Sequence, residues 1–156
     1  MENRFQPGDI VQHFKRKTLN LEELAQNKYL YRIIGVATHS ETGELMMVYQ
    51  PLYDGQGMFV RPLEMFLSRV DREKYPDALQ QYRFEKAEDI IYFSRSHADT
   101  QHLYKYDTET GLFYYMDHCW TGKGSWYESE FPSFDIVQIS ERSARGISKD
   151  NLQGCE

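Results

Sequence analysis

The sequence lacks the features that would place it in a membrane or outside the cell. Its longest uninterrupted apolar runs, Leu45 to Tyr49 and Leu112 to Met116, are far shorter than the roughly 20 residues of a membrane-spanning helix. No apolar signal region follows the first residues, so we expect the protein to remain in the cytoplasm. Of its two cysteines, Cys155 lies at the end of the chain, and a bridge to Cys119 would constrain little. We therefore expect reduced thiols.

Clustered positive charge is also scarce. The chain carries a net charge of −6, and the whole excess of acidic residues falls in the half that follows Lys86. The only basic run, Lys15-Arg16-Lys17, is typical of a solvated turn. Duplex nucleic acid rewards clustered lysine and arginine, so it is an unlikely partner on this composition.

No catalytic or cofactor signature is present. The sequence has no nucleophile elbow, no phosphate-binding G-x-x-x-x-G-K loop and no dinucleotide fingerprint. His97, Asp99 and His102 lack the spacing of a metal site. In a strand, His118 would point away from Asp117 and Cys119, which argues against a cysteine–histidine nucleophile. We therefore expect no cofactor, no metal and no catalytic residues.

Aromatic residues are abundant, with 12 Tyr and 9 Phe, and these residues favour β-sheets. The segment from Tyr29 to Phe66 is typical of a β-meander. Its strands are expected at Tyr29–His39, Glu44–Tyr53 and Met58–Arg61, with turns at 40–43 and 54–57 that end in glycine. This order predicts a compact barrel or sheet.

The remaining elements are predicted from shorter patterns. Asn20 resembles a helix N-cap, which predicts a helix of two turns over Asn20–Gln26, inserted between two strands. We expect a tight turn at 62–66, a strand at 67–70 that closes the sheet and a short helix at 76–82. In the second half we expect strands at 89–94, 103–107, 112–120, 125–130 and 134–139, with turns at 108–111 and 121–124. The fold class is therefore mainly β, with a first domain at 1–86, a second small antiparallel β unit at 87–140 and a disordered tail at 141–156.

The two halves share a short pattern. Glu41-Thr42-Gly43 precedes a glycine pair at Gly55 and Gly57, and Glu109-Thr110-Gly111 precedes a glycine pair at Gly122 and Gly124. This pattern is explained by a duplicated hairpin or, more simply, by the residues that hairpin turns commonly use.

The polar residues of the meander are the candidate site. His39 and Arg61 end strands, and Tyr49 and Tyr53 lie four residues apart on one strand face. Arg61 is suited to hold a carboxylate or phosphate, with Glu64 orienting it. In the structural alternative, Arg61 pairs with Glu64 and the tyrosine hydroxyls satisfy backbone groups.

A second candidate surface is aromatic. It comprises Tyr114, Trp120, Trp126 and Tyr127, which flank the expected turn at 121–124. Such a surface either packs against the rest of the protein or forms an interface, for example in a homodimer.

Four segments between Phe5 and Glu85 resemble a bacterial family, the domain-of-unknown-function family 1653. They are His13-Phe14-Lys15, Tyr31–Gly43, Val48–Tyr53 and Val60–Phe66. The resemblance implies a small SH3-like barrel and no established activity, and the five candidate site residues fall on its motifs. The chain departs from the family where Arg16 replaces a glycine and about a dozen residues, including the predicted helix, are inserted.

These observations favour a cytoplasmic binding module that recognises a peptide or a small anionic ligand through His39, Tyr49, Tyr53, Arg61 and Glu64. Two alternatives stay open. One is a small hydrolase that uses His39 as base and Glu64 as acid. The other is a protein that acts only through protein–protein contacts.

Overall fold

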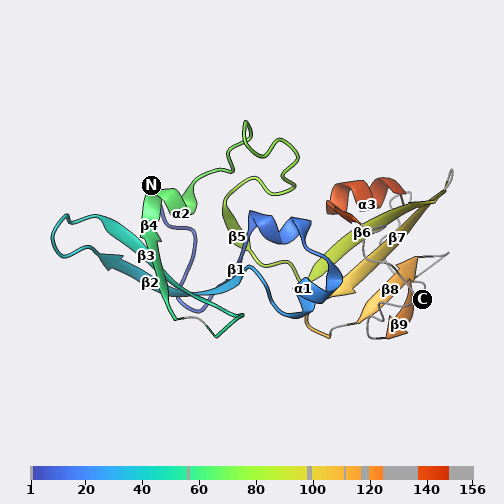
Figure 1. Cartoon of the computed structure of the whole chain (residues 1–156), viewed down its shortest axis with the longest axis horizontal. Coiled ribbons are helices and arrows are strands. Elements are labelled where there is room, and N and C mark those ends of the chain that lie inside the picture. Colours follow the sequence, from blue (N-terminus) through green and yellow to red (C-terminus); the bar gives the residue numbers. More distant parts are fainter. Residues whose placement is uncertain are drawn as a thin grey trace. The chain divides into compact units, whose positions relative to one another are not determined.

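The computed structural model describes residues 2–55, 57–97, 100–110, 112–116, 120–124 and 137–147, and these residues form a mainly β protein with short helices (Figure 1). The chain divides into two compact units. The first comprises Met1–Lys17 and Gln26–Ala87, and the second comprises Thr18–Ala25 and Glu88–Glu156. No described helix has the length and hydrophobicity that a membrane span requires. The described residues also contain no cluster of three or more metal-binding side chains.

The first unit is a five-stranded antiparallel sheet in the order β4-β3-β2-β1-β5. Its strands are β1 (Ile10–His13), β2 (Leu30–Thr38), β3 (Leu45–Pro51), β4 (Phe59–Pro62) and β5 (Phe84–Lys86). The predicted meander is therefore confirmed. In the part of the chain that the structure describes, β4 and β5 are the two edges of the sheet, so no closed barrel is seen.

Turn chemistry explains how these strands are joined. Gly43 ends the β2–β3 loop at φ +73°, where a side chain would be strained. Asp54 and Gly55 follow β3 with φ values of +58° and +57°, the pair of positive angles that a tight hairpin turn needs. Both turns were expected from the sequence.

The core of the first unit lies on one face of this sheet. Residues of β3 alternate along the strand, so that Met47 and Tyr49 are buried on the inner face. Two phenylalanines that follow β4 in the chain complete the core: the rings of Phe66 and Phe84 stack with their centroids 3.9 Å apart. Aromatic side chains therefore supply much of the buried area that stabilises this unit.

A 3₁₀ helix, η1 (Phe14–Thr18), and α1 (Leu21–Ala25) separate β1 from β2. The predicted N-cap is confirmed, because Asn20 Oδ1 accepts the Glu23 N–H at 2.9 Å and Glu23 Oε2 accepts the Asn20 N–H at 3.3 Å. Buried Leu21 and Leu24 anchor α1 in the second unit, to which Thr18–Ala25 belongs.

Three local predictions for the first unit differ from the structure. The expected turn at 62–66 is a helix, α2 (Leu63–Leu67), because Pro62 suits a helix start and Leu63, Phe66 and Leu67 share its buried face. Residues 76–82 form turns instead of a helix. The segment 67–70 contributes only one bridge, between Arg69 and Tyr82, instead of a strand that closes the sheet.

The second unit also contains a five-stranded antiparallel sheet, in the order β10-β6-β7-β8-β9. Its strands are β6 (Ile90–His97), β7 (Thr100–Asp107), β8 (Phe113–Met116), β9 (Trp120–Gly124) and β10 (Val137–Ile139). The predicted turn at 121–124 is therefore part of a strand, and the strand predicted at 125–130 lies outside the described residues.

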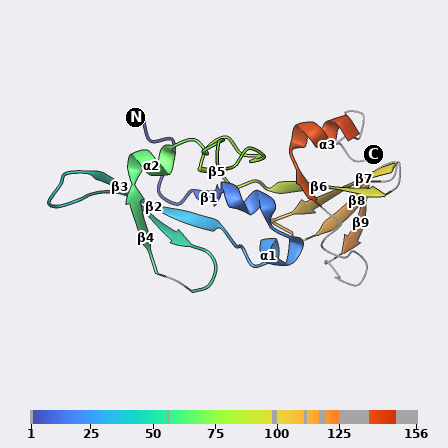
Figure 2. The same cartoon turned by 45° about the horizontal axis from the view of Figure 1, so that its top comes forward.

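The C-terminal helix α3 (Glu141–Ile147) stands where the sequence led us to expect a loose tail, and it lies beside β6 and β7 (Figure 2). Ser140 caps it, since its Oγ accepts the Ser143 N–H at 3.1 Å. Its one buried residue, Ala144, is too small to produce an apolar periodicity in the sequence. This explains why the pattern gave no helix.

Candidate functional site

The inner face of the first sheet carries a group of polar side chains around an aromatic ring. We call it the Tyr–His–Arg cluster and define it as His13, Tyr29, Tyr31, Tyr53 and Arg61 around the Phe84 ring. His13 comes from β1, Tyr31 from β2 and Arg61 from β4, while Tyr29 and Tyr53 lie just outside strands. The cluster is therefore assembled from several strands of the five-stranded sheet.

Two tyrosine hydroxyls meet in this cluster. Tyr31 Oη and Tyr53 Oη are 2.7 Å apart, so one donates a hydrogen bond to the other. Tyr31 is buried and Tyr53 is half-buried. Burial raises the pKa of both phenols, so both remain protonated near neutral pH. One hydroxyl hydrogen is used within the pair, and the other can be donated to a ligand.

His13 supplies a second donor. Its ring lies 5.0 Å from the Phe84 ring, and its Nδ1 accepts the Lys15 backbone N–H at 3.3 Å. Burial first, and then the charges of Arg61, Arg83 and Lys15, lower the pKa of His13 from 6.5 to about 3. The imidazole is therefore neutral near pH 7. With Nδ1 accepting, its single N–H is on Nε2.

Arg61 supplies the charge of the cluster. It points from β4 to the same face as its cross-strand partner Met47, and its guanidinium carbon is 5.7 Å from the centroid of the Phe84 ring. The side chain is half-buried. No described residue forms a hydrogen bond or an ion pair with it. A guanidinium in this situation has five N–H donors, and no described side chain supplies an anion to receive them.

Tyr29 is held in an unusual backbone conformation beside these groups. Its φ is +62°, which is rare for a bulky residue and costs on the order of 1–3 kcal/mol. The result is that its ring approaches His13 and Tyr53, with centroid distances of 5.9 and 6.1 Å. Its carbonyl also accepts the His13 N–H at 3.1 Å. Strain of this kind is frequent at functional sites.

The structure brings together only part of the set predicted from the sequence. Tyr53 and Arg61 belong to the cluster. Tyr49 lies beneath it as a buried core residue, 5.7 Å from the Phe84 ring between centroids. His13 and Tyr29 were not selected from the sequence, although the resemblance quoted the segment that begins at His13.

His39 lies apart from the cluster, in the exposed loop between β2 and β3. Its Nδ1 accepts the backbone N–H groups of Glu41 and Thr42 at 3.3 and 3.2 Å. The backbone N–H of His39 donates to the backbone carbonyl of Glu44 at 2.8 Å. The imidazole therefore caps its own loop.

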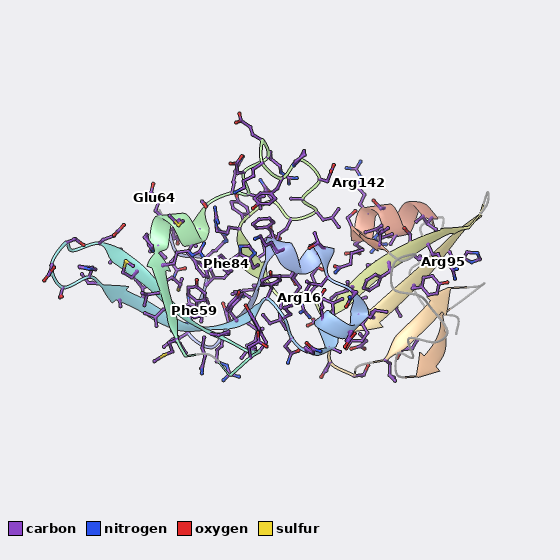
Figure 3. All side chains as sticks on the ribbon, viewed as in Figure 1. Arg16, Phe59, Glu64, Phe84, Arg95 and Arg142 are labelled. Atoms are coloured by element: carbon purple, nitrogen blue, oxygen red, sulfur yellow. The ribbon has the colours of Figure 1, made fainter. Side chains whose placement is uncertain are left out.

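Glu64 is exposed on α2, and its side chain points away from the sheet (Figure 3). Among the described residues, no hydrogen bond or ion pair joins it to Arg61 or to His39. The arrangement gives neither the Arg61–Glu64 pair nor the acid–base pair that a hydrolase built on His39 and Glu64 needs within hydrogen-bond reach.

The second candidate surface is described only in part. Tyr114 is half-buried, and the Lys105 ammonium is 4.9 Å from its ring centroid. Trp126 and Tyr127 lie outside the described residues, and only the backbone of Trp120 is described. A role for this surface as an interface stays a prediction.

Comparison with known proteins gives one match. Residues 9–86, half of the chain, match the model of a family described as "Protein of unknown function (DUF1653)". No curated protein and no solved structure matches the chain. The matched region contains all five strands of the first sheet and every residue of the Tyr–His–Arg cluster. The protein therefore belongs to the family of unknown function DUF1653.

Proposed function

We propose that the first unit is a cytoplasmic binding module of the SH3-like barrel type, and that its Tyr–His–Arg cluster holds the carboxylate or phosphate group of a small ligand or peptide. The observation that carries the proposal is the half-buried guanidinium of Arg61, which no described residue pairs. Removing an arginine from water without a partner is unfavourable, and a bound anion removes that cost.

The other members of the cluster fit the same kind of ligand. The Nε2–H of neutral His13 donates a hydrogen bond without adding a charge that would have to be desolvated. The hydroxyl pair of Tyr31 and Tyr53 offers a further donor. Phenol rings give flat apolar contact at little cost in side-chain entropy. The cluster therefore combines donors for an anionic group with a surface for the apolar part of the same ligand.

Its charge disfavours a cationic ligand. Tyrosine cages recognise quaternary ammonium groups through the faces of the rings. Here the charges of Arg61, Arg83 and Lys15 all act on His13, so the electrostatic potential around the imidazole is positive. A cation would be repelled by these three groups, whereas a carboxylate or phosphate would be attracted.

The proposal is tested by anion binding to the full chain. Inorganic phosphate and a tetrapeptide with a free C-terminal carboxylate are titrated separately, and backbone amide shifts are followed by NMR. Arg61→Met keeps the length of the side chain and removes its charge. It should weaken the better ligand roughly 10- to 100-fold, because a hydrogen bond to a charged group contributes about 1.5–3 kcal/mol.

Arg32→Met is the matched control, because Arg32 is exposed on β2. It should leave binding and the thermal midpoint unchanged. Arg61→Met should keep or raise the midpoint of the ligand-free protein, because it removes the unpaired guanidinium. Binding of the free peptide but not of its C-terminal amide identifies a peptide carboxylate as the ligand. Equal binding by Arg61→Met and wild type, or unfolding of Arg61→Met, would contradict the proposal, the latter because it assigns Arg61 a structural role.

A further inference from the structure

We infer that residues 90–139 repeat the fold of residues 10–86, so that the chain contains two copies of one five-stranded module. In each sheet the first four strands form an antiparallel meander, and the fifth strand pairs with the outer edge of the first. The orders β4-β3-β2-β1-β5 and β9-β8-β7-β6-β10 are therefore the same order. Each strand order is determined within a single unit, so the comparison uses no contact between the two units.

The loop between the second and third strands is the second point of agreement. In the first copy it is the loop that His39 caps. In the second copy Asp107 Oδ1 accepts the N–H groups of Glu109 and Thr110 at 2.9 and 3.0 Å. The Asp107 N–H donates to the Leu112 carbonyl at 3.0 Å, as His39 does to Glu44 at 2.8 Å.

The threonines of the two loops also make the same bond. Thr42 Oγ1 accepts the Glu44 N–H at 3.3 Å, and Thr110 Oγ1 accepts the Leu112 N–H at 3.3 Å. The repeated Glu-Thr-Gly pattern in the sequence therefore stands at the same place in both copies and has the same hydrogen-bonded role.

The strand pairing next to this loop is the third point of agreement. In the first sheet four consecutive pairs follow the loop without a shift, from Thr38 opposite Leu45 to Gly35 opposite Val48. In the second sheet four consecutive pairs also follow it, from Tyr106 opposite Phe113 to Leu103 opposite Met116. Burial along these strands is not shared, because Val36 is exposed and its counterpart Tyr104 is buried.

Common turn chemistry accounts for the loop alone. It does not require the fifth strand to pair with the first strand in both sheets. The copies differ at the proposed site, because Arg61 lies opposite Met47 and Thr121 lies opposite Tyr115. If the proposed function holds, anion binding through this position belongs to the first copy. They also differ in their first connection, where only the first copy has the inserted helices.

The inference is tested on the full chain by cysteine crosslinking of β10, after both native cysteines are replaced by serine. The structure places Val137 directly opposite Ser94 on β6. Directly opposed antiparallel residues have Cβ atoms about 4.5–5.5 Å apart, close to disulfide range. Val137→Cys with Ser94→Cys should therefore form a disulfide on mild oxidation. Val137→Cys with Thr121→Cys tests the competing order, in which the fifth strand follows the fourth.

A disulfide at Ser94 and none at Thr121 supports the repeat. A disulfide at Thr121, or none at Ser94 in a chain that still unfolds cooperatively, overturns it. Urea unfolding of each reduced double variant shows whether the chain is folded, and the Ser94→Thr, Val137→Thr pair shows whether the two positions tolerate substitution. The crosslinks do not depend on a ligand, so failure of the proposed function would leave their outcome unchanged.

Discussion

His13 should make the stability of this protein depend on pH in a specific window. Its pKa is lowered from 6.5 to about 3, mainly by burial and next by the charge of Arg61. Between these two values the unfolded chain binds a proton that the folded chain does not bind. Stability therefore rises with pH across this window, and it is lost as the pH falls through it.

The size of the effect follows from the shift. One pKa unit corresponds to 1.36 kcal/mol, so the shift from 6.5 to about 3 would remove about 4 kcal/mol of stability by pH 3. Between pH 7 and pH 5 the same relation gives a loss of about 2 kcal/mol. A domain is usually stable by only about 5–15 kcal/mol, so a loss of this size should be measurable.

His13→Asn isolates this contribution. Asparagine does not titrate here, and its carboxamide oxygen can replace Nδ1 as acceptor for the Lys15 N–H. Urea unfolding at pH 5, 6 and 7 should show that the wild type loses about 2 kcal/mol more than His13→Asn between pH 7 and 5. Equal pH dependence of wild type and His13→Asn would refute the reasoning.

Two further predictions concern the remaining hydroxyl and imidazole groups. Tyr53→Phe leaves the buried hydroxyl of Tyr31 without its partner, so it should destabilise the protein by about 1–3 kcal/mol. Tyr31→Phe should cost less than about 1 kcal/mol, because water can reach the hydroxyl of half-buried Tyr53. The double variant should be no less stable than Tyr53→Phe in urea unfolding, and additive losses would contradict this coupling. His39→Asp should preserve thermal stability, because Asp107 caps the equivalent loop of the second unit. His39→Ala should cost about 0.5–1.5 kcal/mol. Equal losses from both variants would show that the cap contributes nothing.

The sequence predicted the first sheet well because its signals are local. Glycines at the turns and alternating residues along β2 and β3 determine the strands and their register. The Asn20 cap was equally clear. The helix α2 was missed because Pro62 was interpreted as the end of a strand and not as the start of a helix. The helix α3 has only Ala144 in the core, so it produced no pattern to detect.

The candidate site was harder to predict because contacts between distant residues create it. Arg61 and Tyr53 were selected for their chemistry, and both belong to the cluster. His39 was selected because it ends a strand, but its own loop occupies its ring nitrogen. His13 is buried by Phe84, which lies some 70 residues further along the chain. Tyr29 depends on a backbone conformation that no residue type indicates.

The most direct test of the central claim is the pKa of His13 with and without a bound anion. The imidazole is titrated by NMR in the absence of ligand and at saturating inorganic phosphate. An anion at Arg61 would oppose the guanidinium charge that now lowers the pKa of His13, so this pKa should rise in the complex. Arg61→Met should abolish the response. An unchanged His13 pKa while phosphate shifts signals elsewhere on the protein would contradict the proposed site.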